Sequence, residues 1–279
     1  MRVSFGARLT AAVDARGPLC AGIDPHPWLL RDWGLDDDPA GLERFALTCV
    51  DAMAGEVAVV KPQSAFFERH GSRGIAVLER VVAETQAAGA LVLLDVKRGD
   101  VGSTMAAYAD AYLADGAPLA ADAVTVSPYL GFSALEPAIT AAETTGRGVF
   151  VLARTSNPGG ATVQRADTEG REVAQSVVDD ASERNTGITP IGPVGIVIGA
   201  TIGAADLDIS MLNGPILAPG FGAQGATAAD VRAGFGSSLR HVLPASSREI
   251  LKYGPTIGGI RDATRRVADE LAAGTRHSY

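Results

Sequence analysis

Three of the four charged side chains in residues 93–104, LLDVKRGDVGST, have the types and spacing of an acid–base row. Side chains two positions apart in a strand project to the same side, so Asp95 and Lys97 are expected to be neighbours. Asp100 follows Gly99, where glycine allows the chain to turn sharply. Flanking carboxylates should keep Lys97 protonated, and a lysine held in this way can deliver a proton to a carbanion. Taken alone, the same residues could form a salt-bridged loop at the end of a strand.

Two more charged residues stand at the ends of earlier apolar runs. Lys61 follows EVAVV, where an unpaired buried ammonium would be costly, so it should contact a carboxylate. Asp24 follows LCAGI and precedes Pro25. Each has a plainer interpretation, Lys61 as a salt bridge at a rim and Asp24 as the cap of a turn. Their occurrence together with the row at 95–100 favours one shared site.

A glycine-rich segment, LAPGFGAQGAT at residues 217–227, is suited to binding phosphate together with a later arginine. Such a loop exposes backbone N–H groups, and a guanidinium adds a charge-assisted, two-pronged contact. It is neither a P-loop, because no Gly-Lys-Ser/Thr follows, nor a dinucleotide-binding fingerprint opening an early helix. The candidate phosphate ligands are Gly220, Gly222, Gln224, Gly225 and Arg248.

The elements that must position these residues repeat one pattern, a short apolar run, a polar end and a helical stretch. The expected strands are residues 19–24, 56–61, 90–97, 122–127, 148–155, 194–200, 214–219 and 249–253, with helices expected at 71–88 and 103–116. Continuous apolar runs are typical of parallel strands covered by helices on both faces. Eight units predict the α/β class and a closed (β/α)8 TIM barrel, in which sites lie at the carboxyl ends of the strands. An open doubly wound sheet is the alternative.

Length and composition are consistent with that architecture. No linker interrupts the 279 residues, so a single barrel domain is expected over residues 1–279. Two long connections, near 25–43 and 157–193, are expected to be loop insertions that act as lids or site walls. Hydrophobic residues at 47% exclude disorder, and a net charge of −8 argues against a nucleic-acid-binding surface.

The sequence also leads to expectations about the cellular location of the protein and about metal binding. The N-terminus lacks the apolar core of a secretory signal, and no stretch is long enough to span a membrane. Cys20 and Cys49 both lie in apolar runs and are expected to be buried and reduced, which favours the cytoplasm. The histidines are scattered away from strand ends, so no metal ligand set is expected.

Motifs along most of the chain resemble the orotidine 5′-phosphate decarboxylase family, in its longer bacterial branch. The resemblance rests on GIDP at 22–25, VKP at 60–62, DVKRGD at 95–100, RTSNP at 154–158, GAT at 199–201, PGFGAQG at 219–225 and SSR at 246–248. It implies a (β/α)8 barrel that uses no cofactor and converts orotidine monophosphate to uridine monophosphate and CO₂. It also implies a homodimer with active sites at the subunit interface and a small-molecule nucleotide as substrate. The net charge and the lack of a long apolar stretch predict neither nucleic acid nor membrane as partner.

The same resemblance implies roles for the charged row. Lys97 matches the proton donor to C6 of the pyrimidine, and Asp95 and Asp100 match the carboxylates that flank it. Asp100 is expected to reach into the partner's site. Lys61 and Asp24 match the pair that binds the ribose and extends the row of alternating charges.

Further resemblance implies contacts to the rest of the nucleotide. Thr104 matches a residue that contacts the ribose from across the dimer, and Ser156 matches the contact to the pyrimidine edge. Gln224 and Arg248 match the residues that hold the phosphate.

Two other functions remain open at this stage. Magnesium-dependent sugar-phosphate decarboxylases and aldolases share the D-x-K-x-x-D row, but they place a metal-binding carboxylate where this chain has Lys61. A catalytically silent barrel that binds nucleotides as a regulator would retain the glycine-rich loop and Arg248 while losing the acid–base row, which is complete here.

Overall fold

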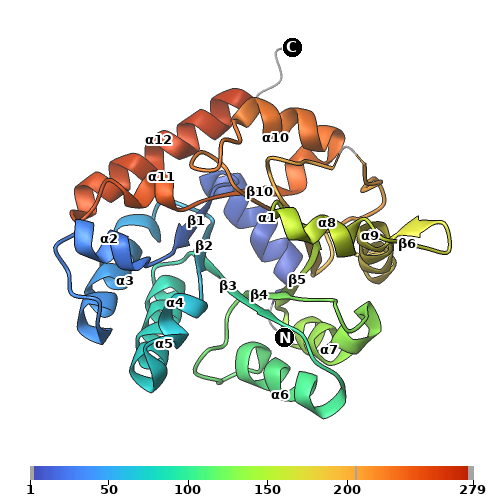
Figure 1. Cartoon of the computed structure of the whole chain (residues 1–279), viewed down its shortest axis with the longest axis horizontal. Coiled ribbons are helices and arrows are strands. Elements are labelled where there is room, and N and C mark those ends of the chain that lie inside the picture. Colours follow the sequence, from blue (N-terminus) through green and yellow to red (C-terminus); the bar gives the residue numbers. More distant parts are fainter. Residues whose placement is uncertain (1–2, 205, 276–279) are drawn as a thin grey trace.

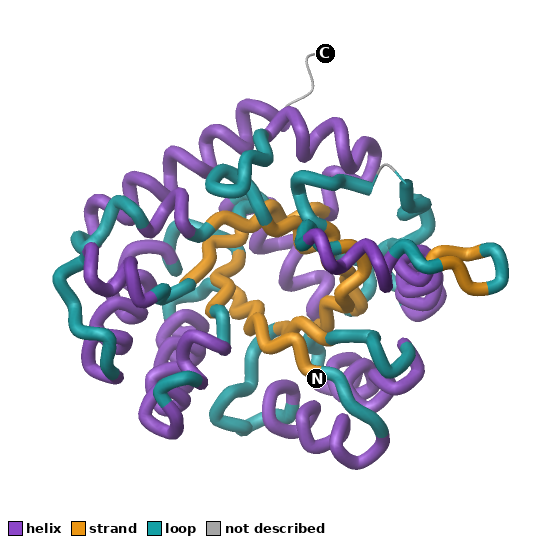
Figure 2. Tube along the Cα trace, in the orientation of Figure 1, coloured by secondary structure: helices purple, strands orange, loops and turns teal. Residues whose placement is uncertain are grey.

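The computed structural model describes residues 3–204 and 206–275, and its centre is a closed barrel of eight parallel strands (Figures 1 and 2). The neighbours around the barrel follow the order β1-β10-β9-β8-β5-β4-β3-β2. The strands are β1 Cys20–Ile23, β2 Val59–Pro62, β3 Leu91–Arg98, β4 Ala123–Val126, β5 Gly148–Arg154, β8 Val194–Ile198, β9 Ile216–Pro219 and β10 Val242–Ser246. The predicted (β/α)8 barrel is confirmed, and the open sheet is excluded because β1 pairs with both β2 and β10.

Helices surround the barrel on its outer side, as the purple ring around the orange strands shows in Figure 2. The longer ones are α3 Pro39–Met53, α5 Gly71–Ala87, α6 Gly102–Leu113, α7 Glu136–Thr145, α9 Val173–Arg184, α10 Ala228–Phe235 and α12 Ile257–Thr275. Shorter ones are α2 Pro27–Asp32, α4 Ala65–Glu68, α8 Ala161–Gln164 and α11 Arg248–Leu251, with 3-10 turns η1 Phe132–Leu135, η2 Pro158–Gly160 and η3 Gly236–His241. The helices expected at 71–88 and 103–116 correspond to α5 and α6.

Two apolar cores explain why the strands are hydrophobic on both faces. The larger lies between the barrel and the outer helices, and the smaller fills the barrel interior. Helix α1, Phe5–Arg16, adds Phe5 and Leu9 to the interior core and lies behind the barrel in Figure 1. A Cβ atom on Gly148 would lie 2.4 Å from the Phe5 ring, so glycine at the start of β5 makes room for this helix. The floor of the barrel is thereby closed, and its other end remains for ligands.

The eighth strand is not where the sequence pattern placed it. Residues 249–253 were expected to form it, but Val242–Ser246 is β10 and Arg248–Leu251 is the short helix α11. Pro244 makes the true strand atypical, because proline cannot donate a ladder hydrogen bond. Tertiary pairing overrides that local signal, since β10 pairs with β9 along residues 242–245. Arg248 therefore lies just beyond the carboxyl end of the last strand.

The two expected insertions contain regular structure. Residues 25–43 hold α2 and the first turn of α3. Residues 157–193 hold η2, α8, a small antiparallel hairpin of β6 Asp167–Thr168 and β7 Arg171–Glu172, and then α9. Because α9 packs against β5 and β8 as an ordinary barrel helix, only the part before it is an addition to the barrel.

Both cysteines are buried and free, as expected. Burial is the main cause that raises the pKa of the Cys20 thiol to about 12, so this thiol stays protonated at neutral pH. Among the described helices, none combines the length and apolar character needed to cross a membrane.

Candidate active site

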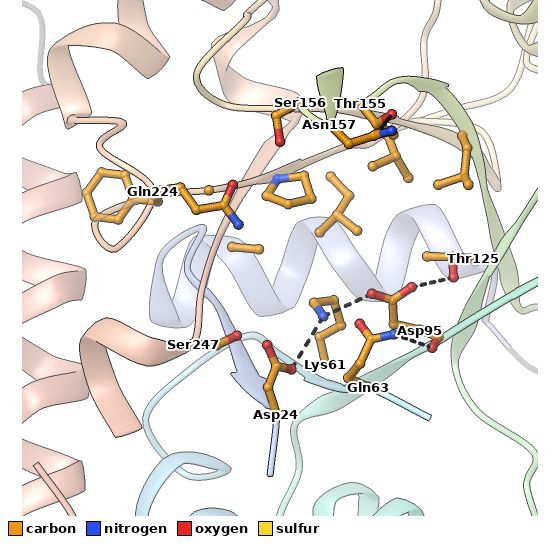
Figure 3. A pocket seen from close by; sticks show the side chains of 18 of the residues that line it. Asp24, Lys61, Gln63, Asp95, Thr125, Thr155, Ser156, Asn157, Gln224 and Ser247 are labelled. Atoms are coloured by element: carbon orange, nitrogen blue, oxygen red, sulfur yellow. Dashed lines mark hydrogen bonds and ion pairs between the residues drawn. The ribbon is translucent and has the colours of Figure 1, made fainter. Parts of the chain in front are cut away.

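A cavity of about 300 Å³ opens at the carboxyl ends of the barrel strands (Figure 3). Most of the residues singled out in the sequence line it, although they come from six different strands or the loops that follow them. These residues are Asp24, Lys61, Asp95, Lys97, Ser156, Gly220, Gln224 and Arg248. The parallel barrel brings them together because the carboxyl ends of all its strands meet at one mouth.

Asp95 is the centre of the charged network. One of its oxygens, Oδ2, lies 3.1 Å from the Lys61 ammonium, and the other, Oδ1, lies 2.6 Å from the Lys97 ammonium. Oδ1 also accepts a hydrogen bond from the Thr125 hydroxyl at 2.7 Å. Burial alone would raise the pKa of this carboxyl, but the charges of Lys61 and Lys97 and the hydrogen bonds outweigh it and hold the pKa well below the ordinary value. Asp95 is therefore a fixed carboxylate.

Lys61 is buried between two carboxylates, as its position after an apolar strand predicted. Besides Asp95, its ammonium lies 3.9 Å from Oδ1 of Asp24. Burial by itself would lower the pKa of Lys61, but the charges of Asp95 and Asp24 outweigh it and raise the pKa, so the side chain remains an ammonium. Asp24 Oδ1 is buried and has no hydrogen-bond partner among the described residues. A ligand hydroxyl would satisfy it, because buried polar atoms are normally hydrogen-bonded.

Lys97 reaches Asp95 from an irregular part of β3. Its φ is +48°, a left-handed conformation uncommon for a residue other than glycine, and the β3–β4 register shifts between Leu94 and Arg98. The regular alternation of side chains expected for this strand is thus absent, yet the Asp95 and Lys97 side chains still meet. The Lys97 side chain is 46% exposed, so its ammonium faces both Asp95 and the open cavity. Such a position suits a group that transfers a proton to a ligand.

Asp100 and Thr104 do not line the cavity of the single chain. The row of Asp95, Lys97 and Asp100 is therefore not formed within one chain, and Asp100 instead accepts a hydrogen bond from the Val101 amide at 2.8 Å. Thr104 is exposed on the first turns of α6. Both residues lie on the segment that leaves the barrel after β3.

The glycine-rich loop forms one rim of the cavity, and Arg248 lines it as well. Gly220, Gly222 and Gly225 all have positive φ values, which explains the glycines. Two of the amides that were expected to hold a phosphate are used within the loop, since Gly222 donates to Ala226 and Gly225 donates to Gly222. Gly222 and Gly225 also lie outside the cavity lining.

Other groups of this rim remain available to an anion. The amides of Ala223 and Gln224 donate to no other described residue, and the Arg248 guanidinium makes no ion pair with one. Gln224 lines the same rim with its amide side chain. An exposed guanidinium without a carboxylate partner, next to free backbone N–H groups, is suited to a phosphate.

Ser156 belongs to a wall formed by the loop after β5. In Figure 3 Thr155, Ser156 and Asn157 extend from this wall toward a cavity bounded on the opposite side by Asp24, Lys61 and Asp95. Thr155 is fixed twice by Gln164 of α8, through its amide at 2.9 Å and its hydroxyl at 2.7 Å. Part of the 157–193 insertion therefore acts as a site wall.

Sequence reasoning gave no role to five polar residues of the cavity, which are Gln63, Thr125, Thr155, Asn157 and Ser247, although Thr155 ends an expected strand and Asn157 and Ser247 lie in the family motifs. Each lies in or just beyond a strand end, so the rule that polar strand ends converge on one mouth could have identified them. Within residues 3–204 and 206–275, no group of three or more His, Cys, Asp or Glu side chains is arranged to hold a metal ion.

The fold and the site together define a (β/α)8-barrel protein with a lysine–aspartate network and, beside it, a rim suited to an anion at the barrel mouth. A family model described as orotidine 5′-phosphate decarboxylase / HUMPS family matches residues 17–254. This chain belongs to that family.

Individual relatives are similar over nearly their whole length. The orotidine 5′-phosphate decarboxylase of Salinispora arenicola is 62% identical over 97% of this chain and 98% of that protein. The Streptomyces coelicolor protein of the same description is 56% identical over 96% of each chain. A crystal structure of a Streptomyces avermitilis protein matches this chain with a TM-score of 0.95 and 55% identity, over 98% of this chain and 96% of that one. The resemblance inferred from the motifs is confirmed.

Proposed function

We propose that this enzyme decarboxylates orotidine 5′-phosphate to uridine 5′-phosphate and CO₂, the last step of uridine monophosphate synthesis, without a metal or organic cofactor. The observation that carries the proposal is the network of Asp24, Lys61, Asp95 and Lys97 at the mouth of a barrel of this family, in which Lys61 and Asp95 are buried. Its fixed charges match a reaction in which a substrate carboxylate leaves and a proton takes its place.

In the proposed step, the bond between C6 of the pyrimidine and its carboxylate carbon breaks, and the electron pair stays on C6. The Asp95 carboxylate lies beside the leaving carboxylate and repels it, which raises the energy of the bound substrate. The Lys97 ammonium stabilises the developing carbanion and then donates its proton to C6. CO₂ departs, and Lys97 regains a proton from solvent, to which its side chain is partly open.

The remaining polar groups of the cavity bind the nucleotide in this proposal. Asp24 and Lys61 hold the ribose hydroxyls, because Asp24 has a buried oxygen without a hydrogen-bond partner beside the Lys61 ammonium. Ser156 contacts the pyrimidine edge, and Gln224 and Arg248 hold the phosphate. Binding energy from the distant phosphate can then be used at the reacting carbon when the loops close.

We also propose that the active unit is a homodimer in which Asp100 and Thr104 enter the partner's cavity. Support comes from large apolar side chains near these residues, since Val101 is 55% exposed and Tyr129 of the β4–η1 connection is 79% exposed. Leu130, beside Tyr129, is also exposed. Exposed apolar patches of this kind mark interaction surfaces.

The first experiment follows the ultraviolet absorbance of orotidine monophosphate with purified enzyme, with and without EDTA. Conversion that is unaffected by EDTA is expected, because the Lys61 ammonium would repel a divalent cation from the place where related metal-dependent enzymes hold one. Conversion abolished by EDTA would contradict the role given to Lys61. Absence of turnover would contradict the reaction and favour a metal-dependent sugar phosphate as substrate.

The proton donor is tested by Lys97→Ala. Turnover should fall by at least the 10²- to 10⁴-fold typical of a lost general acid, about 3–5 kcal/mol of activation free energy. Lys252→Ala is the matched control, since Lys252 has a similarly exposed side chain paired with a carboxylate, Glu249. Near-wild-type turnover in Lys97→Ala would rule out the proposed donor.

The shared site is tested by mixing two inactive variants, Lys97→Ala and Asp100→Asn. In a mixed dimer one site carries both changes and the other carries neither, so random exchange should restore up to about a quarter of the wild-type activity. Activity that never rises above that of the separate variants, in a mixture shown to exchange subunits, would mean that Asp100 acts within its own chain.

A further inference from the structure

The hydroxyl of Thr125 makes two hydrogen bonds, both within the lysine–aspartate network. It donates to Asp95 Oδ1 at 2.7 Å and accepts from the backbone N–H of Lys97 at 3.0 Å. Chemistry fixes both directions, because an ionised carboxylate can only accept and an amide N–H can only donate. Thr125 is 1% exposed, so water from the bulk cannot easily replace either bond.

The position of Thr125 in the sheet explains why its side chain, rather than a backbone carbonyl, accepts the hydrogen bond from the Lys97 N–H. In the β3–β4 pairing Leu94 stands opposite Val124 and Arg98 stands opposite Val126. The three residues 95–97 on β3 therefore face the single residue Thr125 on β4. Lys97 cannot follow the regular ladder there, and its N–H finds the threonine hydroxyl instead of a backbone carbonyl.

The same irregularity places Lys97 in an uncommon backbone conformation. At φ +48° a side chain bearing a Cβ is strained, and such a conformation persists only where the surroundings hold it. The Thr125 hydroxyl supplies one such restraint on the Lys97 backbone. It also fixes the oxygen of Asp95 that the Lys97 ammonium contacts, so one hydroxyl sets both ends of the Asp95–Lys97 pair (Figure 3 shows Thr125 and Asp95).

We propose that Thr125 is a positioning residue for the proton transfer, holding the Asp95 carboxylate and the strained Lys97 backbone in register with each other. This inference rests on the proposed function, in which Lys97 gives its proton to the substrate. Without the hydroxyl, the Lys97 N–H and Asp95 Oδ1 each lose a buried partner, and the ammonium no longer has a fixed position relative to the reacting carbon. Small displacements of this kind are costly, since about 1 Å can reduce a rate by about 100-fold.

The test compares Thr125→Val with Thr125→Ser. Valine keeps the branched shape and removes the hydroxyl, and kcat for orotidine monophosphate should fall about 10- to 100-fold with little change in KM. Serine retains the hydroxyl and should restore kcat to within about threefold of wild type. A merely structural threonine would not produce this separation of kcat from KM, nor the rescue by serine.

Thr85→Val provides the matched control. Thr85 is also fully buried, but its hydroxyl has no hydrogen-bond partner among the described residues and it lies on α5, away from the cavity. It carries the same chemical change without touching the network, so its kcat should equal that of wild type. Should Thr125→Val fail to fold, Thr125→Cys replaces it, because a thiol is only a weak donor and acceptor and the same loss of kcat is expected.

Amide hydrogen exchange at Lys97 gives a second measurement that does not depend on turnover. The Lys97 N–H should exchange faster in Thr125→Val than in wild type and stay protected in Thr125→Ser. Faster exchange with unchanged kcat would overturn the positioning role, and so would unchanged exchange with unchanged kcat. A wild-type enzyme that does not turn over orotidine monophosphate would refute the proposed function and this role with it, whereas an active wild type with an equally active valine variant refutes only the role of Thr125.

Discussion

Replacing Asp95 by asparagine isolates the electrostatic contribution of the central carboxylate. The substitution keeps the size and shape of the side chain and removes its charge. Lys61, which is 5% exposed, would then retain only Asp24, whose nearest oxygen lies 3.9 Å from the ammonium. An ammonium buried with too little compensating charge destabilises the fold, so Asp95→Asn should lower the free energy of unfolding.

The distances set the size of the effect. Coulomb's law with an effective dielectric constant of about 20 gives about 5 kcal/mol for the 3.1 Å pair of Asp95 with Lys61 and about 4 kcal/mol for the pair with Asp24. The Lys97 ammonium is close to solvent, so its pairing with Asp95 adds no more than about 1 kcal/mol. Removing one partner of a buried pair typically costs about 3–5 kcal/mol, and we expect Asp95→Asn to fall in that range.

Urea denaturation at pH 7 and a fixed protein concentration measures this loss. Asp37→Asn is the control, because Asp37 pairs with Arg69 at the surface, where an ion pair contributes about 0–1 kcal/mol. An Asp95→Asn protein as stable as wild type would refute the reasoning, since it would mean that the cost of burying Asp95 equals its attraction to both lysines.

Two more predictions concern the phosphate and the pH. Arg248→Ala should weaken binding of uridine monophosphate about 10- to 150-fold, which corresponds to the loss of a charge-assisted hydrogen bond of about 1.5–3 kcal/mol. Binding of uridine, which has no phosphate, should be unchanged. Calorimetry that finds equal losses of affinity for both ligands would contradict a phosphate contact. The depressed pKa of Asp95 contributes stability above its ordinary value of 3.8 that is lost as the pH falls toward the depressed value. The raised pKa of Lys61 contributes stability below its ordinary value of 10.5 that is lost as the pH rises through the raised value. When the free energy of unfolding is measured from pH 3 to 11, Asp95 and Lys61 should both contribute their full stabilisation between about pH 5 and 10. A loss of stability centred near neutral pH would contradict the two pKa shifts.

The sequence by itself determined the barrel and most of its mouth. Apolar strands that end in polar residues can be predicted from their own short sequences, because each strand is buried on both faces and its polar end marks where burial stops. Lys61 illustrates this, since an ammonium after an apolar run requires a carboxylate wherever the chain folds. The order of the motifs in the chain was sufficient to identify the family.

Other features depended on contacts between segments distant in the sequence. Because of Pro244, the sequence of the last strand does not have a typical strand pattern, and the strand is recognised only from its pairing with β9. The left-handed Lys97 and the partner it finds in Thr125 arise from a shift of register between two strands, and no local pattern encodes such a shift. Asp100 is a second example, because its spacing along the chain placed it beside Lys97, whereas in the structure it lies outside the cavity lining and accepts a hydrogen bond from the Val101 amide. Local sequence sets which residues are buried and charged, whereas the pairing of strands decides which of them meet.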